Sequence, residues 1–573
     1  MNQQSVVFSS TPMTFVKWLV ALMAIVFSAV AQETTVVTDS VLPQHLRSQF
    51  ENSSQFDSLG LNHAIQVKSF YDAREHVPVW SSQYGLYEHV ARFLLAVDSA
   101  YHHGLQVNDF HRDRITYLST SPKPDEVAEL DLLLTDAFFT YARRMGQGHL
   151  KPSMFDNDWH YELRKIDSSL LLNQVFNDAD MQRVIQSLEP QHKEYKQLVS
   201  ALKIYTDIQK NGGWPQISVR GESLEYGGKG DEISVLRQRL RITNDLDPLS
   251  RDEPEFDVEL EKAVKKFQGR HGLDVDGKVG RKTRLALNAS VEKRIEQLML
   301  NLERWRWLPR DFGDRYIMVN AAGFNLTAFD GDREPLSMKV IVGKQKRKTP
   351  SFSEVMTHVV VNPYWNIPTK LALEDLIPKE LSAPGYMEKK QIRVFSGWDK
   401  QSVELDSSAI NWKDFEGKKY LPYRLRQDPG RSNSLGRIKF MFPNRFSVYM
   451  HDTPSRRLFN RSVRTYSSGC VRLERPFDLA SYYLDGDARI QKIRQLVSTG
   501  KRQRIRLSKP VSVHLLYLTA WANQDGKIQF RNDVYRKDAL MMAQMPASDT
   551  GRFTLNAEKG KAVVSVPVSL LKN

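Results

Sequence analysis

The chain has 573 residues, of which 41% are apolar and 26% charged, and its formal net charge at pH 7 is +14. This composition is typical of ordinary globular proteins. The length predicts several domains, because one hydrophobic core stops growing near ~250 residues. A basic protein can bind nucleic acid, but the sequence contains no nucleic-acid-binding motif, so we expect no such partner. An anionic cell-surface polymer, or a basic surface with no partner, are the alternatives.

The N-terminal segment has the pattern of a secretory signal peptide over residues 1–31. Lys17 is followed by an apolar run over 18–27 and then by Ala29-Val30-Ala31, a small-x-small cleavage site. The apolar run is shorter than the roughly 20 residues that span a membrane. We therefore expect an exported protein, with membrane contact only if the segment stays uncleaved as an anchor.

Residues 32–230 have the pattern of a helical domain. Apolar residues recur at helical spacing over 88–105 and over 128–150, where Gly146 and Gly148 are expected to stop the second helix. No catalytic constellation is recognisable in the sequence of this region. It therefore predicts a helical scaffold domain.

Residues 231–290 predict a small three-helix domain after a glycine-rich linker at 226–232. Its helices are expected at 233–240, 258–271 and 280–287, and about 60 residues just support one small core. The segment resembles a peptidoglycan-binding domain of the type 1 family, and the matching residues are Phe267, Gln268, Gly272, Leu273, Asp276, Gly277, Gly280 and Thr283. The resemblance implies peptidoglycan binding; the alternative is a spacer that only packs on its neighbours.

Residues 291–310 predict a connecting helix that leads into the next domain. One face carries apolar residues at helical spacing, namely Ile295, Leu298, Met299 and Leu302. Trp305 and Trp307 end the helix before Pro309. Tryptophans at such a position belong more often to a core or an interface than to a ligand site.

Residues 311–540 predict a mainly-β domain, which makes the whole chain a multidomain α+β protein. From Tyr316 onwards, β-branched and aromatic runs are separated by Gly, Pro and Asn, as in strands. Between Pro368 and about Ser434 this rhythm stops, and a long irregular insertion in a compact domain is usually functional. Residues 370–432 are therefore a predicted lid. A helix is expected at 476–484, a hairpin turn at Asp525-Gly526, and residues 541–573 form a C-terminal extension.

The sequence contains one cysteine, Cys470, in the stretch YMHDTPSRRLFNRSVRTYSSGCVRLERP. In an exported protein such a cysteine is a reactive thiol, an intermolecular partner or a buried inert residue. His451 ends a predicted strand, and Gly469 allows a tight turn directly before the sulfur. A helix is expected shortly afterwards. The surrounding arginines are Arg456, Arg457, Arg461, Arg464, Arg472 and Arg475.

These features predict a cysteine nucleophile with His451 as proton acceptor and donor. The pKa of a thiol, ordinarily about 8.5, falls near cations or a helix N-terminus, so we expect Cys470 to be ionised. The backbone N–H groups of Gly469 and Cys470 are candidates for an oxyanion hole. No metal or other cofactor is expected, because no second cysteine or close histidine cluster is present. Ser467 or Ser468 as nucleophile would lack a Gly-x-Ser-x-Gly context.

The segment resembles the catalytic domain of the YkuD-type L,D-transpeptidases. Their pattern is a histidine, a gap, and then Ser/Thr-x-Gly-Cys before an apolar residue and Arg, and the matching residues are His451, Ser467, Gly469, Cys470, Val471 and Arg472. Many members have a histidine where this chain has Ser468, and the departure resembles the long, YcbB-like branch. An upstream stretch also resembles the family, through Gly343, Thr349, Pro350, Pro363, Trp365 and Pro368. The domain order is similar to that branch as well.

This resemblance implies acyl transfer on peptidoglycan tetrapeptide stems. Cys470 would attack the bond between meso-diaminopimelate and the terminal D-Ala, and His451 would protonate the departing D-Ala. The diaminopimelate amine of a second stem would then take the acyl group, which gives a 3→3 crosslink. The resemblance also implies that the Asp452 carbonyl orients His451, that the lid limits water and that carbapenems acylate Cys470. Implied substrate-binding residues are Arg472, Tyr449, Trp365, Ser467 and Ser468.

Other acceptors remain open within the same resemblance. Water would make an L,D-carboxypeptidase or a hydrolase that releases wall-linked proteins, and a lipoprotein lysine would make an attaching enzyme. A wall-binding scaffold with an inert Cys470 is the non-catalytic alternative. The expected partners are donor and acceptor stems and other wall-synthesis enzymes, and the expected location is the periplasm.

Overall fold

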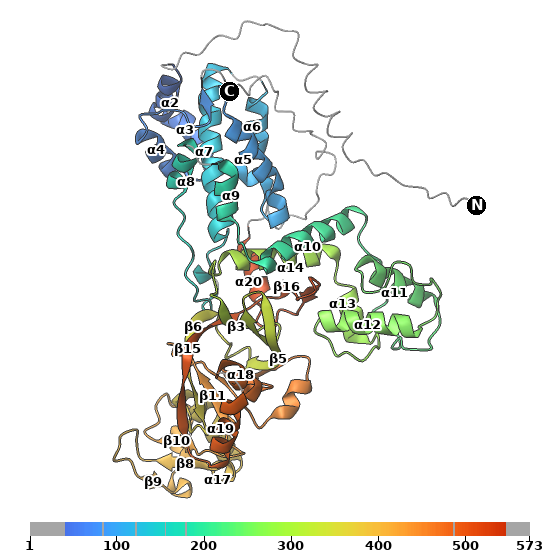
Figure 1. Cartoon of the computed structure of the whole chain (residues 1–573), viewed down its shortest axis with the longest axis vertical. Coiled ribbons are helices and arrows are strands. Elements are labelled where there is room, and N and C mark those ends of the chain that lie inside the picture. The colour runs from blue at the N-terminus through green and yellow to red at the C-terminus, as the bar shows by residue number, and fades with distance from the viewer. Residues whose placement is uncertain are drawn as a thin grey trace, which may run out of the picture.

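The computed structural model describes residues 41–82, 85–120, 123–154, 156–177, 180–484 and 487–545. The predicted signal peptide, and all but the first residues of the predicted C-terminal extension, lie outside these ranges. Figure 1 shows a helical region at one end, a small helical module to the side and a β-rich region at the other end. This arrangement confirms the predicted multidomain α+β architecture.

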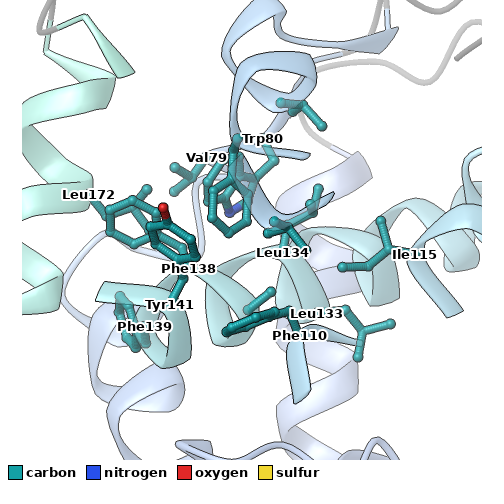
Figure 2. Packing of buried hydrophobic residues seen from close by; sticks show 14 of the residues in the cluster. Val79, Trp80, Phe110, Ile115, Leu133, Leu134, Phe138, Phe139, Tyr141 and Leu172 are labelled. Carbon is teal, nitrogen blue, oxygen red and sulfur yellow. The ribbon is translucent and has the colours of Figure 1, made fainter. Parts of the chain in front are cut away.

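The helical region is built around α7 (Pro124–Gln147), the long helix expected from the apolar spacing. It ends at Gly148, whose φ of +90° suits glycine. The buried Asp131 carboxylate on α7 accepts hydrogen bonds from the Tyr71 hydroxyl at 2.5 Å and from the Trp80 N–H at 3.0 Å. Aromatic and aliphatic side chains pack around this helix, as Figure 2 shows. Its other helices are α2 (Val41–Glu51), α3 (Ser53–Ser58), α4 (Ala64–Asp72), α5 (Glu88–Ser99), α6 (Arg112–Leu118), α8 (Ser168–Phe176) and α9 (Met181–Leu188).

Two further helices, α10 (Lys193–Lys210) and α14 (Val291–Arg306), pack against each other where the regions meet. Their apolar faces share one core with residues 150–161 and with the end of the β domain. Trp305 and Trp307 are buried in this core, at 1% and 2% exposure. The predicted connecting helix is therefore part of a junction that joins the helical and β regions. Among the helices in the described ranges, none has the length and apolar content that crossing a membrane requires.

The small module consists of α11 (Asp231–Ile242), α12 (Val258–Arg270) and α13 (Arg281–Leu287), close to the predicted helices. Gln268, at its centre, donates hydrogen bonds to Asp276 Oδ1 at 2.8 Å and to Thr283 Oγ1 at 3.2 Å, and accepts one from the Gly277 N–H at 2.9 Å. These motif residues therefore hold the turn between two helices. The module also contacts the β domain, where Arg531 donates to the Arg270 carbonyl at 2.9 Å.

The β domain contains a nine-stranded sheet in the order β13-β5-β14-β12-β11-β6-β15-β3-β4. Because β4 also pairs with β5, the sheet closes on itself. The bounds are β3 (Arg315–Asn320), β4 (Asn325–Asp330), β5 (Arg333–Gly343), β6 (Phe352–Val361), β11 (Ile438–Met441), β12 (Met450–His451), β13 (Thr465–Ser467), β14 (Val471–Leu473) and β15 (Gln503–Leu516). One face packs with α18 (Pro476–Tyr483) and α19 (Asp487–Ser498) in a single core. The predicted hairpin turns at Asp525-Gly526, between β16 (Ala520–Ala522) and β17 (Ile528–Phe530), and α20 (Lys537–Gln544) follows.

The predicted lid differs from the irregular insertion expected, because it is a folded subdomain. It has its own four-stranded sheet in the order β7-β10-β8-β9, and its own apolar core. Charged side chains interrupt the apolar pattern of its strands; Arg393, for example, pairs with Glu404 and with Asp428. The subdomain lies at the end of the molecule remote from the helical region (Figure 1). Its main elements are β7 (Trp365–Asn366), α15 (Thr369–Leu371), η4 (Ala372–Leu376), α16 (Ile377–Ser382), α17 (Tyr386–Lys389), β8 (Ile392–Phe395), β9 (Glu404–Leu405) and β10 (Arg424–Gln427).

Candidate active site

Cys470 lies at the end of a tight turn that leads into β14. Gly469 has a φ of +111°, in the region that favours glycine. Ser467 Oγ donates to the Cys470 carbonyl at 2.5 Å and accepts the Gly469 N–H at 3.2 Å. Ser467 is 1% exposed, so it shapes the turn instead of lining a substrate site. The Gly469 N–H, expected to hold an oxyanion, is directed to Ser467 in this structure.

The upstream motif residues support the same turn from β5 and the loop that follows it. Thr349 Oγ1 donates to the Gly469 carbonyl at 2.8 Å and accepts the Gly343 N–H at 3.0 Å. A Cβ on Gly343 would lie against the backbone of Arg347, which leaves no room for a larger residue. The Tyr535 hydroxyl donates to the Gly343 carbonyl at 2.7 Å. The motif residues Gly343 and Thr349 therefore fix the backbone on which Cys470 is presented.

His451 lies on β12, which pairs in parallel with β14, and it is directly opposite Arg472. Its Nδ1 is 2.5 Å from the Asp452 carbonyl oxygen, and the ring makes a further backbone hydrogen bond to Leu435. The Asp452 carboxylate is itself held by the Arg437 N–H at 2.9 Å and by Arg456 at 3.3 Å. Because a carbonyl oxygen only accepts, Nδ1 carries the hydrogen and Nε2 is left as the acceptor.

Cys470 and His451 are diagonal neighbours on adjacent strands, because His451 pairs with Arg472, two residues after the thiol. Diagonal Cα atoms in a sheet are roughly 7–8 Å apart, a distance that these side chains can span. Within the described ranges no hydrogen bond joins the two side chains, and Cys470 Sγ lies 3.9 Å from the Ser447 carbonyl oxygen. The tertiary fold thus places the two residues together from positions 19 apart in the sequence (470 − 451).

Tyr449 connects the thiol to the lid. Its hydroxyl is hydrogen-bonded to Cys470 and to Trp365, the first residue of β7. The Lys439 ammonium lies 3.5 Å from the centroid of the Tyr449 ring. Lys439 was not predicted as a site residue, although the alternation of Ile438, Lys439 and Phe440 already indicated a polar position on the other face of a half-buried strand.

The electrostatics of the pair differ from the expected ionised thiol. Burial raises the pKa of the Cys470 thiol, and the hydrogen bonds from Tyr449 and the charges of Lys439 and Arg472 oppose this only in part. Burial, and then the Arg472 charge, lower the pKa of His451 to about 3. Desolvation penalises both charged forms. At neutral pH the resting pair is therefore a neutral thiol and a neutral imidazole.

Two other expectations about the surroundings of Cys470 are corrected by the structure. The thiol is not at a helix start, because β14 separates it from α18. Most of the arginines near it in sequence are engaged elsewhere. Arg464, for example, donates to the carbonyls of Val340 and Phe324. Arg472 is the member of that group whose charge acts on the thiol.

Arg347, which the sequence did not single out, joins the lid to the catalytic turn. It donates to Asp375 Oδ2 at 2.6 Å and to Glu374 Oε2 at 2.5 Å, both on η4 of the lid. It also donates to Ser468 Oγ at 3.0 Å, two residues before the thiol. Ser468 is therefore held against the lid anchor. No local sequence pattern signals this contact, because its members come from three separate segments.

Comparisons with known proteins agree with this architecture. Residues 314–502 match the family described as "L,D-transpeptidase catalytic domain" (YkuD), residues 229–287 match "Putative peptidoglycan binding domain", and residues 65–202 match "Scaffold domain". A protein of Haemophilus influenzae named "Putative L,D-transpeptidase" is 39% identical over 254 residues, which are 44% of this chain and 50% of that protein. The chain thus spans about half the length of the curated relative that it matches.

Two solved structures are also similar to part of the chain. The L,D-transpeptidase (residues 123–326) from Xylanimonas cellulosilytica is 16% identical with a TM-score of 0.16, and covers 52% of this chain and 98% of its own. A fused Zn-dependent amidase/peptidase/peptidoglycan-binding domain-containing protein from Clostridium acetobutylicum is 11% identical with a TM-score of 0.14, and covers 52% and 100%. Both likenesses are too weak to define the fold.

The β domain, with its cysteine turn and neighbouring histidine, is of the L,D-transpeptidase class. Residues 314–502 are a YkuD-family L,D-transpeptidase catalytic domain. In this chain that domain follows a scaffold domain and a peptidoglycan-binding domain.

Proposed function

We propose that the protein is an L,D-transpeptidase that joins two diaminopimelate residues of peptidoglycan stems through a thioester on Cys470. The proposal rests chiefly on the position of His451, on the strand next to the thiol and with Nδ1 fixed by the Asp452 carbonyl. This arrangement leaves Nε2 to accept the thiol proton. A catalytic hydrogen bond that is long in the free enzyme often tightens only when substrate binds.

In the first half-reaction, Cys470 Sγ attacks the carbonyl carbon of the diaminopimelate–D-Ala bond while its proton passes to His451 Nε2. The C–N bond then breaks, and the imidazolium gives the proton to the amine of D-Ala, which leaves. Because the pair is neutral at rest, the proton moves as the S–C bond forms. With the Gly469 N–H engaged by Ser467, the Cys470 N–H is the member of the predicted pair that remains for the oxyanion.

In the second half-reaction, the side-chain amine of diaminopimelate on another stem attacks the thioester carbon. His451 takes the amine proton and returns it to sulfur as the S–C bond breaks. An acceptor amine has to reach the site before water does, and the lid contact through Trp365 and Tyr449 supports exclusion of water there. We propose the 3→3 crosslink as the product on this basis.

The decisive experiment incubates a purified disaccharide-tetrapeptide with the wild-type protein and with Cys470→Ala, followed by mass spectrometry. Wild type is expected to give crosslinked dimers with loss of one D-Ala, and the variant none. Monomeric tripeptide alone would indicate the carboxypeptidase alternative, and equal dimer levels with both proteins would reject a cysteine enzyme. A carbapenem is expected to add its mass to the wild-type chain but not to Cys470→Ala.

We also infer that residues 1–31 direct export and that the mature chain acts in the periplasm, where peptidoglycan and other wall-synthesis enzymes are its partners. The signal pattern and the net charge of +14 support this inference, because wall stems carry free carboxylates. Cell fractionation with N-terminal sequencing tests it. A cytoplasmic chain that begins at Met1 would contradict the inference.

A further inference from the structure

The sheet face that carries His451 also carries a row of basic side chains. The strand register places Arg504 opposite Val360, Val360 opposite Lys439, and Lys439 opposite His451. His451 is in turn opposite Arg472. Paired residues in a sheet point to the same side. One continuous row therefore crosses five strands, from β15 to β14, and ends beside Cys470.

The same alternation extends the row along β15. Arg502 and Arg506 have the parity of Arg504, and Arg506 is opposite His358. Residues of the other parity, including Val359, Phe440 and Val471, are buried in the domain core. The basic row is therefore on the face directed away from that core. We call Arg472, Lys439, Arg502, Arg504 and Arg506 the cationic stripe.

The cationic stripe has no acidic partner. Across the residues that the structure describes, none of its five members forms a salt bridge with a carboxylate. The Nε of Arg472 is buried without a hydrogen-bond partner. Arg504 approaches only the neighbouring His358, at 3.4 Å. A buried donor left unpaired costs free energy, which a bound acceptor would recover.

The positive charges of the stripe act on one another. Burial lowers the pKa of His358, and the charges of Arg504, Lys439, Arg506 and Arg502 lower it further. Burial lowers the pKa of Lys439 too, with Arg502 adding to the effect and the thiolate form of Cys470 opposing it. Unneutralised like charges on neighbouring strands are destabilising. A ligand that binds here would therefore carry negative charge.

The length of the stripe fits a short extended peptide. Strands in a sheet lie about 4.8 Å apart, so the four steps from β14 to β15 span roughly 19 Å. An extended peptide covers about 3.3–3.6 Å per residue, so five or six residues span this length. A stem whose reacting carbonyl lies at Cys470 can thus extend across β12, β11 and β6 to β15.

We infer that the cationic stripe is a subsite for the free carboxylates of a peptidoglycan peptide stem, laid across the strands with its reacting end at the thiol. The inference rests on the proposed function for the identity of the ligand. Guanidinium groups bind carboxylates with two parallel hydrogen bonds, so Arg472 holds a carboxylate close to the thiol. Arg504 and Arg506, on the exposed part of β15, hold carboxylates further along the stem.

The test compares the variant Arg504→Glu/Arg506→Glu with the control Arg183→Glu/Lys203→Glu. Arg183 and Lys203 are exposed on α9 and α10 and have no ion pair among the described residues, so both variants change the net charge equally. A fluorescent tetrapeptide stem is titrated into both variants in the Cys470→Ala background. The stripe variant is expected to bind about tenfold more weakly at low salt, and the control as tightly as its parent. Equal binding by the stripe variant overturns the inference, whether or not the protein is a transpeptidase.

Two rates measured with the intact thiol then identify which stem occupies the stripe. Slower formation of the acyl-enzyme from a tetrapeptide, seen by intact mass, assigns it to the donor stem. Normal acyl-enzyme formation with slower transfer to a second stem assigns it to the acceptor. Iodoacetamide alkylation of Cys470 is expected to be unchanged in both variants. If wild type forms no acyl-enzyme, the proposed reaction fails while the binding result still decides the stripe.

Discussion

Arg347 and Asp375 form a two-point ion pair between the loop after β5 and the inserted lid, with N–O distances of 2.6 and 2.9 Å. The Arg347 side chain is largely buried, at 17% exposure. Paired hydrogen bonds of this kind fix an orientation as well as contributing energy. Because Arg347 also donates to Ser468, the position of the lid and the shape of the cysteine turn are mechanically linked.

Arg347→Gln is expected to slow acylation of Cys470 by a tetrapeptide stem about fivefold to tenfold, because the lid loses its charged anchor. Lys370→Gln is the matched control, since Lys370 is exposed and only approaches Glu374 at 3.9 Å within the lid. Acylation is measured by intact mass, and hydrogen exchange of the lid strands reports the loosening. Acylation and exchange that both match wild type would show that the ion pair does not hold the lid.

The pH dependence of thiol alkylation is expected to have its midpoint above the ordinary thiol value of about 8.5. The sign follows from burial, which raises the pKa of Cys470 and keeps the thiol protonated to higher pH. Lys439→Gln removes a cation that favours the thiolate, so the midpoint rises further. His451→Gln leaves the midpoint unchanged, because an imidazole with a pKa of about 3 is neutral throughout this range, yet it abolishes acylation by a stem.

Iodoacetamide rates between pH 6 and pH 10 measure this midpoint directly. A midpoint near neutrality that moves when His451 is replaced would demonstrate a thiolate–imidazolium pair instead. Such a result would contradict the conclusion that desolvation decides the charge state of the site.

Tyr449→Phe is expected to reduce acylation about tenfold, in line with the loss of one hydrogen bond to a group that becomes charged. The Tyr449 hydroxyl lowers the pKa of Cys470 and links it to Trp365, while its ring also contacts Lys439. Phenylalanine keeps the ring contact and removes only the hydroxyl. The alkylation midpoint should therefore rise as well.

Tyr364→Phe serves as the control for this substitution, because Tyr364 precedes Trp365 but is exposed. It should leave both the acylation rate and the alkylation midpoint at their wild-type values. An equal loss in the two variants would assign the effect to the lid as a whole and not to the Tyr449 hydroxyl.

Gly436→Ala is expected to lower both stability and activity, because Gly436 lies against the carboxylate of Asp452, the residue whose carbonyl orients His451. Its φ is +63°, and a Cβ there would overlap the Asp452 side chain. Gly331→Ala is the matched control, with a φ of +57° and open space around it. Both substitutions carry the left-handed cost of about 1 kcal/mol.

The overlap at Gly436 should add about 2 kcal/mol to that cost, seen as a lower midpoint of urea unfolding. Acylation should fall in Gly436→Ala alone, because displacement of Asp452 releases the His451 ring. Equal unfolding midpoints for the two variants would show that Asp452 moves aside without penalty.

The amino-acid sequence by itself determined the local structure and the nucleophile candidate. Helical spacing marked α7 and α14, and β-branched runs marked β3 to β6. The Gln268 network and the turn at Gly469 were recognisable because each is formed by residues close together in the chain. A single cysteine after Ser-Ser-Gly, with His451 at the end of a predicted strand, was enough to locate the site.

Only the tertiary structure decided which charges meet at that site and what state the thiol takes. Lys439, Arg347 and Trp365 come from separate segments, and most of the arginines next to Cys470 in sequence point elsewhere. The lid strands were hidden because their charged residues find partners across the subdomain. Protonation of the thiol depends on desolvation, which is set by how completely the assembled elements cover it, and composition does not encode that. Local periodicity fixes the elements, whereas burial and through-space contacts fix the chemistry.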